Sequence, residues 1–361
     1  MGIIVNKSPK PVLSILVISH NQKDLLPRCL DSVLCQKLSV SYEVIVSDDR
    51  STDGTWELIQ EYEKRYPNIV KGVKCNSDLC NPSTRSERCG WNKATVYKHS
   101  QGDFFVNIDA DDYLRSDDIY QHQLDLLMDN PTCSMCQQRI WQVTDGKPIE
   151  TGYAWPVHPK LKEGAILTPA EAILNGIYGL NPTYMIRRNR AENPAEKYGR
   201  LYDDTIITLY HMQYGNIVFT DRADYVWVQY SNSISNSDKG DERELLYAIL
   251  PYQHALLIPK FADLFMSVAN LPLLHTLKKS LLGKIELQQN TIQYLTQFEG
   301  FIFQYYAKGQ KGLRNRIRLA RSLILYRQIR KGKKTDERAR NKLYQLLIGD
   351  KTSRKDENSY V

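Results

Sequence analysis

The stretch DFFVNIDADDY, residues 103–113, constrains the fold of this chain more than any other. Its first half is mostly apolar, which predicts a strand covered on both faces, as in a parallel sheet. Its second half places Asp109, Asp111 and Asp112 within four residues. Neighbouring carboxylates repel one another, so we expect a divalent cation beside them, Mg²⁺ or Mn²⁺, for which oxygen ligands are suited. The alternative is an Asp-rich turn that caps a helix beginning near Ser116.

The chain before this stretch alternates between strand-like and helix-like patterns. Runs of β-branched and aliphatic residues predict buried strands, and the segments between them have helical periodicity. This alternation predicts a mostly parallel α/β sheet flanked by helices, in which ligands bind at the carboxyl ends of the strands. Ser19, Asp49 and Asp109 all fall at such ends. The predicted strands are 12–19, 42–47 and 68–74, and the predicted helices are 23–36 and 56–66.

Beyond residue 75 the pattern is less regular. The polar segment 76–91 predicts a loop, and Thr168 before Pro169 predicts the N-cap of a short helix. A polar segment at 231–241 predicts the boundary between an α/β domain, 12–235, and a helical region, 242–361. The further predicted helices are 93–99, 116–128 and 206–214, and the further predicted strands are 133–143, 184–188, 217–219 and 225–228.

Composition is that of a globular protein, with 42% hydrophobic and 25% charged residues among 361. No apolar run approaches the roughly 20 residues needed to span a bilayer, and residues 1–10 do not resemble a secretory signal. We therefore expect a cytoplasmic protein whose seven cysteines are reduced. Cys133 and Cys136 form a C-x-x-C pair, but a second matching pair is absent, so buried free thiols are favoured over a zinc site.

The positive charge is concentrated near the C-terminus. Residues 308–361 carry 17 Lys/Arg and 5 Asp/Glu, a net charge of +12, against +7 for the whole chain, which leaves −5 elsewhere. Residues 311–334 place an aliphatic stripe beside arginines, as in an interfacial amphipathic helix. This pattern predicts peripheral binding to an anionic membrane surface. The alternative is a solvated helix packed on the α/β domain, and no motif supports nucleic-acid binding.

Five short motifs resemble those of family 2 glycosyltransferases, in the correct order over residues 12–235. Residues 48–55, DDRSTDGT, are similar to the family's DDxSxDGT signature, and residues 109–112, DADD, resemble its DxDD metal motif. The remaining three are Ile18-Ser-His-Asn21 at the first strand end, Asn92-Lys-Ala94 after a glycine, and the acidic pair Asp203-Asp204. Each motif is weak alone, but five in register are specific.

The resemblance implies a GT-A fold, a nucleotide-sugar donor and inversion at the anomeric carbon. It implies that Asp111 binds the metal, that Asp109 touches the metal or the ribose, and that Asp112 shares the metal or orients the others. Asp49 would accept a hydrogen bond from the ring N–H of uracil or thymine, and Ser19 and Asn21 would line the same pocket.

On the acceptor side the resemblance assigns the general base to Asp204, with Asp203 as the second choice. We expect the dipole of the helix that begins there to lower the pKa of Asp204. Trp91 replaces the arginine usual in the family, so an arginine on the diphosphate would be Arg85 or Arg88. The QxxRW motif of processive synthases is absent, which favours addition of one sugar.

The predicted activity is transfer of one sugar from a UDP- or dTDP-sugar to a lipid-linked or polysaccharide acceptor. One alternative is a nucleotidyltransferase, although residues 18–21 lack its basic, Gly-rich signature. Another is a non-catalytic scaffold whose basic tail is its function, which the intact acidic motifs disfavour.

Overall fold

The computed structural model describes residues 10–82, 85–144, 147–148, 161–178, 181–230, 254–255, 257–262, 264–265 and 324. The chain divides into two compact units, Met1–Ser237 and Asp238–Val361, and the division falls within the polar segment 231–241. The predictions for the basic tail, 308–361, lie outside the described residues except at Ile324. The fold described below is that of the first unit.

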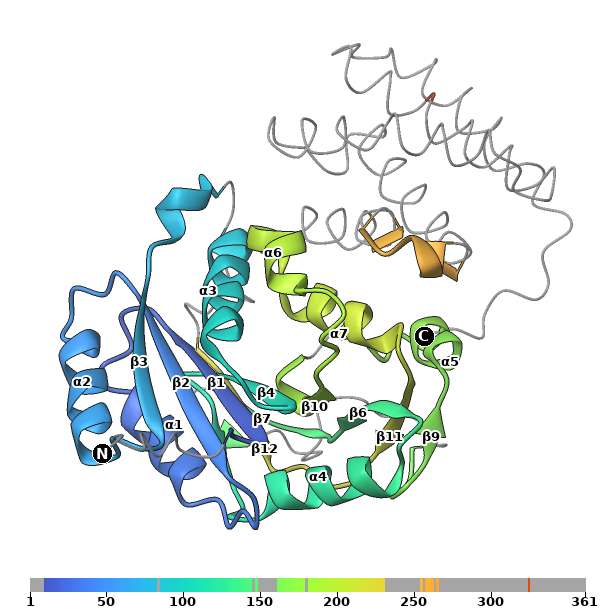
Figure 1. Cartoon of the computed structure of the whole chain (residues 1–361), viewed down its shortest axis with the longest axis horizontal. Helices are drawn as coiled ribbons and strands as arrows, with labels where there is room; N and C mark the ends of the chain where they lie inside the picture. Colours follow the sequence, from blue (N-terminus) through green and yellow to red (C-terminus); the bar gives the residue numbers. More distant parts are fainter. Residues whose placement is uncertain are drawn as a thin grey trace, which may run out of the picture. The chain divides into compact units, whose positions relative to one another are not determined.

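The predicted parallel strands form one half of the main sheet (Figure 1). All seven residues of β1 are buried, because the strand lies inside the sheet with helices on both faces. Four strands run parallel in the order β3-β2-β1-β4. They are β1 (Leu13–Ser19), β2 (Tyr42–Asp49), β3 (Val70–Cys75) and β4 (Phe104–Asp109).

The other half of the main sheet is mixed. β10 (Tyr184–Arg187) runs antiparallel between β4 and β6 (Cys133–Gln137), and β11 (Asn216–Phe219) is parallel to β6. β9 (Ile166–Leu167) closes the edge. A second sheet has the order β5-β12-β7-β8. Its strands are β5 (Tyr113–Leu114), β12 (Tyr225–Gln229), β7 (Ile140–Thr144) and β8 (Lys147–Pro148).

The single strand predicted at 133–143 is wrong, because β6 and β7 belong to different sheets. Gln138 lies at the break and is fully buried. Its backbone N–H donates to the Thr183 carbonyl at 3.0 Å, and its side-chain oxygen accepts from the backbone N–H groups of Asp224 and Tyr225. The chain changes sheets where a buried glutamine satisfies backbone groups that strand pairing would otherwise satisfy.

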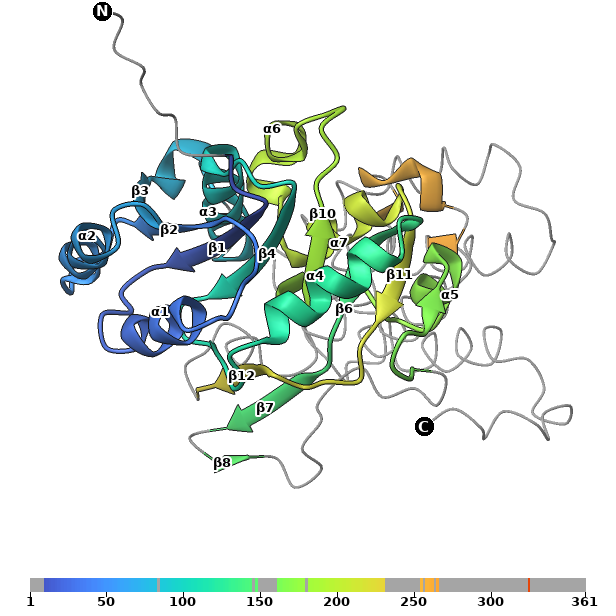
Figure 2. The same cartoon turned by 60° about the horizontal axis from the view of Figure 1, so that its bottom comes forward.

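Helices cover both faces of the main sheet. α1 (Leu26–Leu34) and α4 (Ile119–Asp129) lie on one face, and α3 (Arg85–His99) and α7 (Asp204–Met212) lie on the other (Figures 1 and 2). α2 (Thr55–Arg65) follows β2 and packs against β3. The predicted cap of α5 (Pro169–Leu174) is confirmed, since Thr168 and Glu171 form a capping box. The short elements of this unit are α6 (Pro194–Tyr198), η1 (Ser77–Cys80), η2 (Asn181–Thr183) and η3 (Gly199–Leu201), and η4 (Pro259–Phe261) belongs to the second unit.

Helix α3 begins at Arg85, so the loop predicted over 76–91 is wrong in its second half. Gly90 lies inside this helix, although glycine has a low helix propensity and so favoured a loop in the sequence. Its missing side chain allows close packing instead, because a Cβ atom at Gly90 would lie 2.2 Å from the Arg200 carbonyl oxygen. The contact between α3 and η3 therefore requires glycine, which local propensity does not reveal.

We expect Gly90→Ala to lower the free energy of unfolding by about 1–3 kcal/mol, the usual range for overpacking. Alanine favours a helix by about 1 kcal/mol over glycine, but here its Cβ meets a backbone carbonyl rather than a flexible side chain. Urea denaturation measures the difference. Ser86→Ala on an exposed position of α3 is the control and should be neutral or slightly stabilising. A Gly90→Ala protein as stable as the control would contradict this packing argument.

Candidate active site

The parallel register brings the acidic strand ends to one edge of the sheet. Ser19 at the end of β1 pairs with Asp48 of β2, and Ile18 of β1 pairs with Asp109 of β4. Strand ends that are far apart in sequence therefore lie side by side, as the α/β pattern predicts. The carboxyl ends of β2, β1 and β4, which are neighbours in the sheet, form the candidate active site.

The carboxylates after β4 have different surroundings. Asp109 is 33% exposed, and its Oδ1 lies 3.3 Å from the Lys93 Nζ. Burial, and then the neighbouring Asp109, raise the pKa of Asp111 to about 6, while contacts with Gln22 and Lys93 oppose the shift. Two close carboxylates of which one resists ionisation fit a divalent cation, which would relieve their repulsion.

Asp112 is held inside the protein. Its Oδ1 accepts from the Val228 backbone N–H at 2.8 Å, and its Oδ2 accepts from the Tyr225 hydroxyl. Burial, with Asp111 and Asp109 nearby, raises the pKa of Asp112 well above its ordinary value. Both oxygens are engaged with β12, so the geometry favours the orienting role for Asp112 over metal binding. Among the described residues, no three His, Cys, Asp or Glu side chains are arranged to hold a metal.

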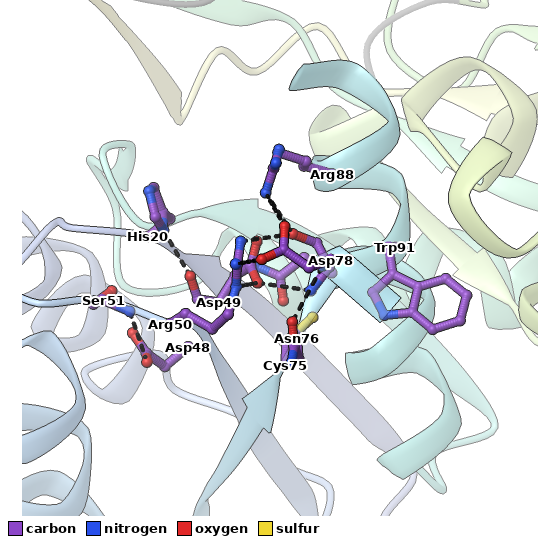
Figure 3. A network of polar contacts seen from close by, with 12 residues as sticks. His20, Asp48, Asp49, Arg50, Ser51, Cys75, Asn76, Asp78, Arg88 and Trp91 are labelled. Atoms are coloured by element: carbon purple, nitrogen blue, oxygen red, sulfur yellow. Dashed lines mark hydrogen bonds and ion pairs between the residues drawn. The ribbon is translucent and has the colours of Figure 1, made fainter. Parts of the chain in front are cut away.

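Asp49 ends β2 in a polar network (Figure 3). Its Oδ1 accepts from the Ser77 backbone N–H at 2.9 Å and from Arg50 Nε at 3.2 Å. Arg50 takes the left-handed conformation with φ 59°, which folds its guanidinium back toward Asp49. Within the described residues the Asp49 Oδ2 has no hydrogen-bond partner. One oxygen is thus fixed by the fold and the other is left for a donor from a ligand.

Arg88 extends from α3 toward the same network. Its Nη1 donates to Asp78 Oδ1 at 3.0 Å and to Ser77 Oγ at 3.2 Å, and Arg50 also pairs with Asp78 (Figure 3). Arg88 therefore lies beside the Asp49 end of the site. The side chain of Arg85, the other arginine predicted to contact the diphosphate, is not among those that the structure describes. The contact of either arginine with a diphosphate stays a prediction.

Ser19 contacts the neighbouring strand β2, and Asn21 contacts the loop that follows it. The Ser19 hydroxyl donates to the Ser47 carbonyl at 2.7 Å and is buried. Asn21 has φ 51°, and its Oδ1 accepts from the Thr52 backbone N–H at 2.9 Å. The first bond joins β1 to β2 and the second joins the loops that follow these strands, and contact with a nucleotide stays a prediction for both residues.

The asparagine of the third motif ties the same region to α3. Asn92 Oδ1 accepts from the Ser47 hydroxyl at 2.5 Å, and its Nδ2 donates to the Ser19 carbonyl at 3.3 Å. A buried amide thus joins a helix to the ends of two strands, which explains why asparagine stands at this position.

Asp203 and Asp204 have different roles at the start of α7. Asp203 is the N-cap, and its Oδ1 accepts from the Ile206 backbone N–H at 2.9 Å. Burial raises the pKa of Asp203 to about 6. Asp204 lies in the first helical turn, is 33% exposed and pairs with Lys93 through Oδ1. The expectation that the helix dipole lowers the pKa of Asp204 is wrong, because burial and Asp109 raise it more than Lys93 lowers it.

Lys93 is the residue that sequence reasoning missed. It lies on α3, its side chain is 3% exposed, and it contacts both Asp109 and Asp204. Burial alone would lower the pKa of Lys93, but the two carboxylates raise it above its ordinary value, so the side chain stays protonated. Helical spacing could have revealed it, since Lys93 lies between Cys89 and Tyr97 at i ± 4 on an otherwise apolar face.

The cysteine pair and the search for membrane-spanning helices concern the rest of the chain. Cys133 and Cys136 are buried free thiols within one hydrophobic core cluster, and no group of three His, Cys, Asp or Glu side chains that could hold a metal is found among the described residues. In the part of the chain that the structure describes, no helix is both long enough and apolar enough to cross a membrane.

Comparison with known proteins agrees with this geometry. Residues 14–179 match the family described as Glycosyl transferase family 2. The chain is 30% identical over 106 residues to the poly(ribitol-phosphate) beta-glucosyltransferase of Bacillus spizizenii, covering 29% of this chain and 16% of that protein. It is 29% identical over 146 residues to the chondroitin synthase of Pasteurella multocida, covering 40% of this chain and 14% of that protein. The chain thus matches about a seventh of the length of these relatives.

Solved structures share the fold. S. aureus TarS 1-349 in complex with UDP-GlcNAc superposes with a TM-score of 0.50 at 17% identity, over 89% of this chain and 92% of that chain. The likeness confirms the predicted α/β fold with a large central sheet flanked by helices, as in GT-A glycosyltransferases. Asp203 and Asp204 lie beyond the segment that matches the family.

Proposed function

Because residues 14–179 belong to glycosyl transferase family 2, we propose that this protein moves one sugar from a UDP- or dTDP-sugar to an acceptor hydroxyl, with inversion. The observation that carries the proposal is the meeting of three acidic groups at one edge of the sheet. Asp109 ends β4 and Asp111 follows it, Asp49 ends β2, and Asp204 reaches Asp109 through Lys93. Each group has a separate task in sugar transfer.

The donor side consists of Asp49, Asp109 and Asp111. The Asp49 Oδ2 would accept the ring N–H of uracil or thymine, a donor that cytosine lacks at the same position. Asp109 and Asp111 would hold Mg²⁺ or Mn²⁺ together with the diphosphate. When bound, the cation stabilises the charge that develops on the leaving diphosphate. The protein residues fix the nucleotide so that the anomeric carbon faces the acceptor.

The acceptor side is assigned to Asp204. A single displacement with inversion needs a base opposite the leaving group, which removes the proton of the attacking hydroxyl as the new bond forms. The Oδ1 of Asp204 is held by Lys93, and within the described residues its Oδ2 has no hydrogen bond. That oxygen is available to accept the proton, and no covalent sugar–enzyme intermediate is required.

The acceptor is proposed to be a polysaccharide or lipid-linked glycan. One relative is named a poly(ribitol-phosphate) beta-glucosyltransferase and the other a chondroitin synthase, and both names refer to a polymer. The net charge of +12 in residues 308–361 supports an anionic surface, such as a membrane, as the place where the acceptor is met.

Binding of nucleotides in the presence of Mn²⁺ tests the donor class. UDP and dTDP should raise the melting temperature, whereas CDP and GDP should not. Ligand at about 100 times its dissociation constant adds about 2.7 kcal/mol of stability. Asp49→Asn should reduce the preference for UDP over CDP, because an amide can donate to the cytosine ring nitrogen. Equal stabilisation by all four nucleotides would argue against a uracil- or thymine-specific pocket.

The product distinguishes this activity from nucleotidyl transfer. Sugar transfer releases UDP or dTDP, whereas nucleotidyl transfer releases pyrophosphate. Incubation with each UDP- and dTDP-sugar, followed by measurement of both products, therefore decides between the two enzymes. Pyrophosphate without nucleoside diphosphate would overturn the proposal.

A further inference from the structure

Lys93 connects the two sides of the proposed active site. It projects from α3, the helix that also carries Arg88 and Asn92. Its Nζ lies 3.3 Å from the Asp109 Oδ1, on the donor side, and is hydrogen-bonded to the Asp204 Oδ1, on the acceptor side. The residues that meet here are far apart in sequence, since Lys93 and Asp204 are separated by 111 residues along the chain. One buried cation thus spans the place where donor and acceptor would meet.

Stability alone is a weak reason for such an arrangement. Taking a lysine and a carboxylate out of water costs free energy that their attraction roughly repays, and apolar residues of similar size often stabilise a core as well. The Lys93 side chain is 3% exposed, whereas its two partners are each 33% exposed. The ammonium group is therefore fixed by the core, and the carboxylates that it holds face the site.

We propose that Lys93 is a positioning residue, which holds the Asp204 carboxylate in line with the donor bound at Asp109. This inference rests on the proposed function. The contact engages Oδ1 of Asp204 and leaves Oδ2 directed to the acceptor hydroxyl. Because Lys93 also contacts Asp109, the distance between the base and the donor is set by one side chain. Lys93 itself touches neither substrate, and its effect passes through Asp204.

Substitution with methionine tests the proposal, because methionine keeps the length of the side chain and removes the charge. In Lys93→Met, kcat at saturating donor should fall by about 10²-fold, the cost of misplacing a reacting group by about 1 Å. Affinity for UDP with Mn²⁺, measured by calorimetry, should be unchanged or tighter, because a cation beside Asp109 has been removed. A variant that is merely misfolded would lose both together.

Lys98→Met is the matched control. Lys98 is exposed on the same helix, where its ammonium lies 5.4 Å from the centroid of the Trp91 ring. This control should keep wild-type turnover and affinity. A Lys93→Met protein with turnover within about threefold of the control, or one that loses Mn²⁺–UDP binding in parallel with turnover, would overturn the proposal.

Melting temperatures separate this inference from the proposed function. Lys93→Met, Asp204→Asn and the double variant form a cycle that needs no substrate. If Lys93 holds Asp204, the double variant should lose less than the sum of the two single losses. Additive losses would show that the contact does not form and would overturn the inference. A wild-type protein that transfers no sugar would instead overturn the proposed function, and the cycle would still report on the contact.

Discussion

Asp204→Asn is expected to lower the rate of sugar transfer by about 10²–10⁴-fold, the usual contribution of a general base. The amide keeps the shape of the side chain but does not accept the proton of the acceptor hydroxyl. Helix α7 should persist, because its cap is provided by Asp203 and not by Asp204. Donor affinity should stay near that of the wild type, since Asp204 faces the acceptor. Transfer rate and donor affinity, measured side by side, check the prediction.

Asp203→Asn is the matched control for this substitution. Asparagine caps a helix about as well as aspartate, and the bond to the Ile206 backbone N–H is kept. Transfer by this variant should therefore stay near wild type. If Asp203→Asn abolishes transfer and Asp204→Asn does not, the base is Asp203. If neither substitution matters, the base lies elsewhere and the assignment of the acidic pair is wrong.

The pH dependence of transfer follows from the same residue. A base acts only in its deprotonated form, and burial raises the pKa of Asp204 above that of an ordinary aspartate. Activity should therefore be lost as the pH falls through this raised pKa, at a higher pH than for an exposed aspartate. A rate profile at saturating donor shows the position of this acid limb.

Asp111→Ala is expected to abolish metal-dependent binding of UDP or dTDP and, with it, measurable transfer. Asp109 and Asp111, unlike Asp112, do not have both carboxylate oxygens hydrogen-bonded within the described part of the protein. Removal of Asp111 therefore leaves a single candidate metal ligand. The protein should remain folded, because Asp111 resists ionisation where it stands and its loss relieves repulsion. Calorimetry with UDP in Mn²⁺ and in chelator measures the effect. Equal affinity under both conditions for the wild type would refute metal-dependent binding.

Asp112→Ala provides the contrast from the neighbouring position. It removes the acceptor of the Tyr225 hydroxyl and the Val228 backbone N–H, both in β12. Each unsatisfied buried donor costs about 1–3 kcal/mol, so this variant should lose stability first and nucleotide binding only as a consequence. A stable Asp112→Ala protein that has lost metal binding would show that Asp112 is a metal ligand.

Local pattern was sufficient for the elements that lie in the middle of the sheet. The apolar runs of β1, β2 and β4 predict their strands because a strand covered on both faces is mostly apolar in its middle. Their parallel arrangement places Ser19, Asp49 and Asp109 at one edge, so the sequence also locates the candidate site. The N-cap at Thr168 was predictable from local sequence too, because the hydrogen bonds of its capping box span only three residues.

By itself, then, the sequence determined the class of fold, the positions of the acidic motifs and the edge of the sheet where they gather. Only the tertiary structure decided that α3 continues through Gly90, that Gln138 divides β6 from β7, and that Lys93 joins Asp109 to Asp204. It also reversed the expected pKa shift of Asp204. The physical reason is common to all four: periodicity and propensity report on neighbours along the chain, whereas close packing, burial and ion pairing depend on residues that folding alone brings together.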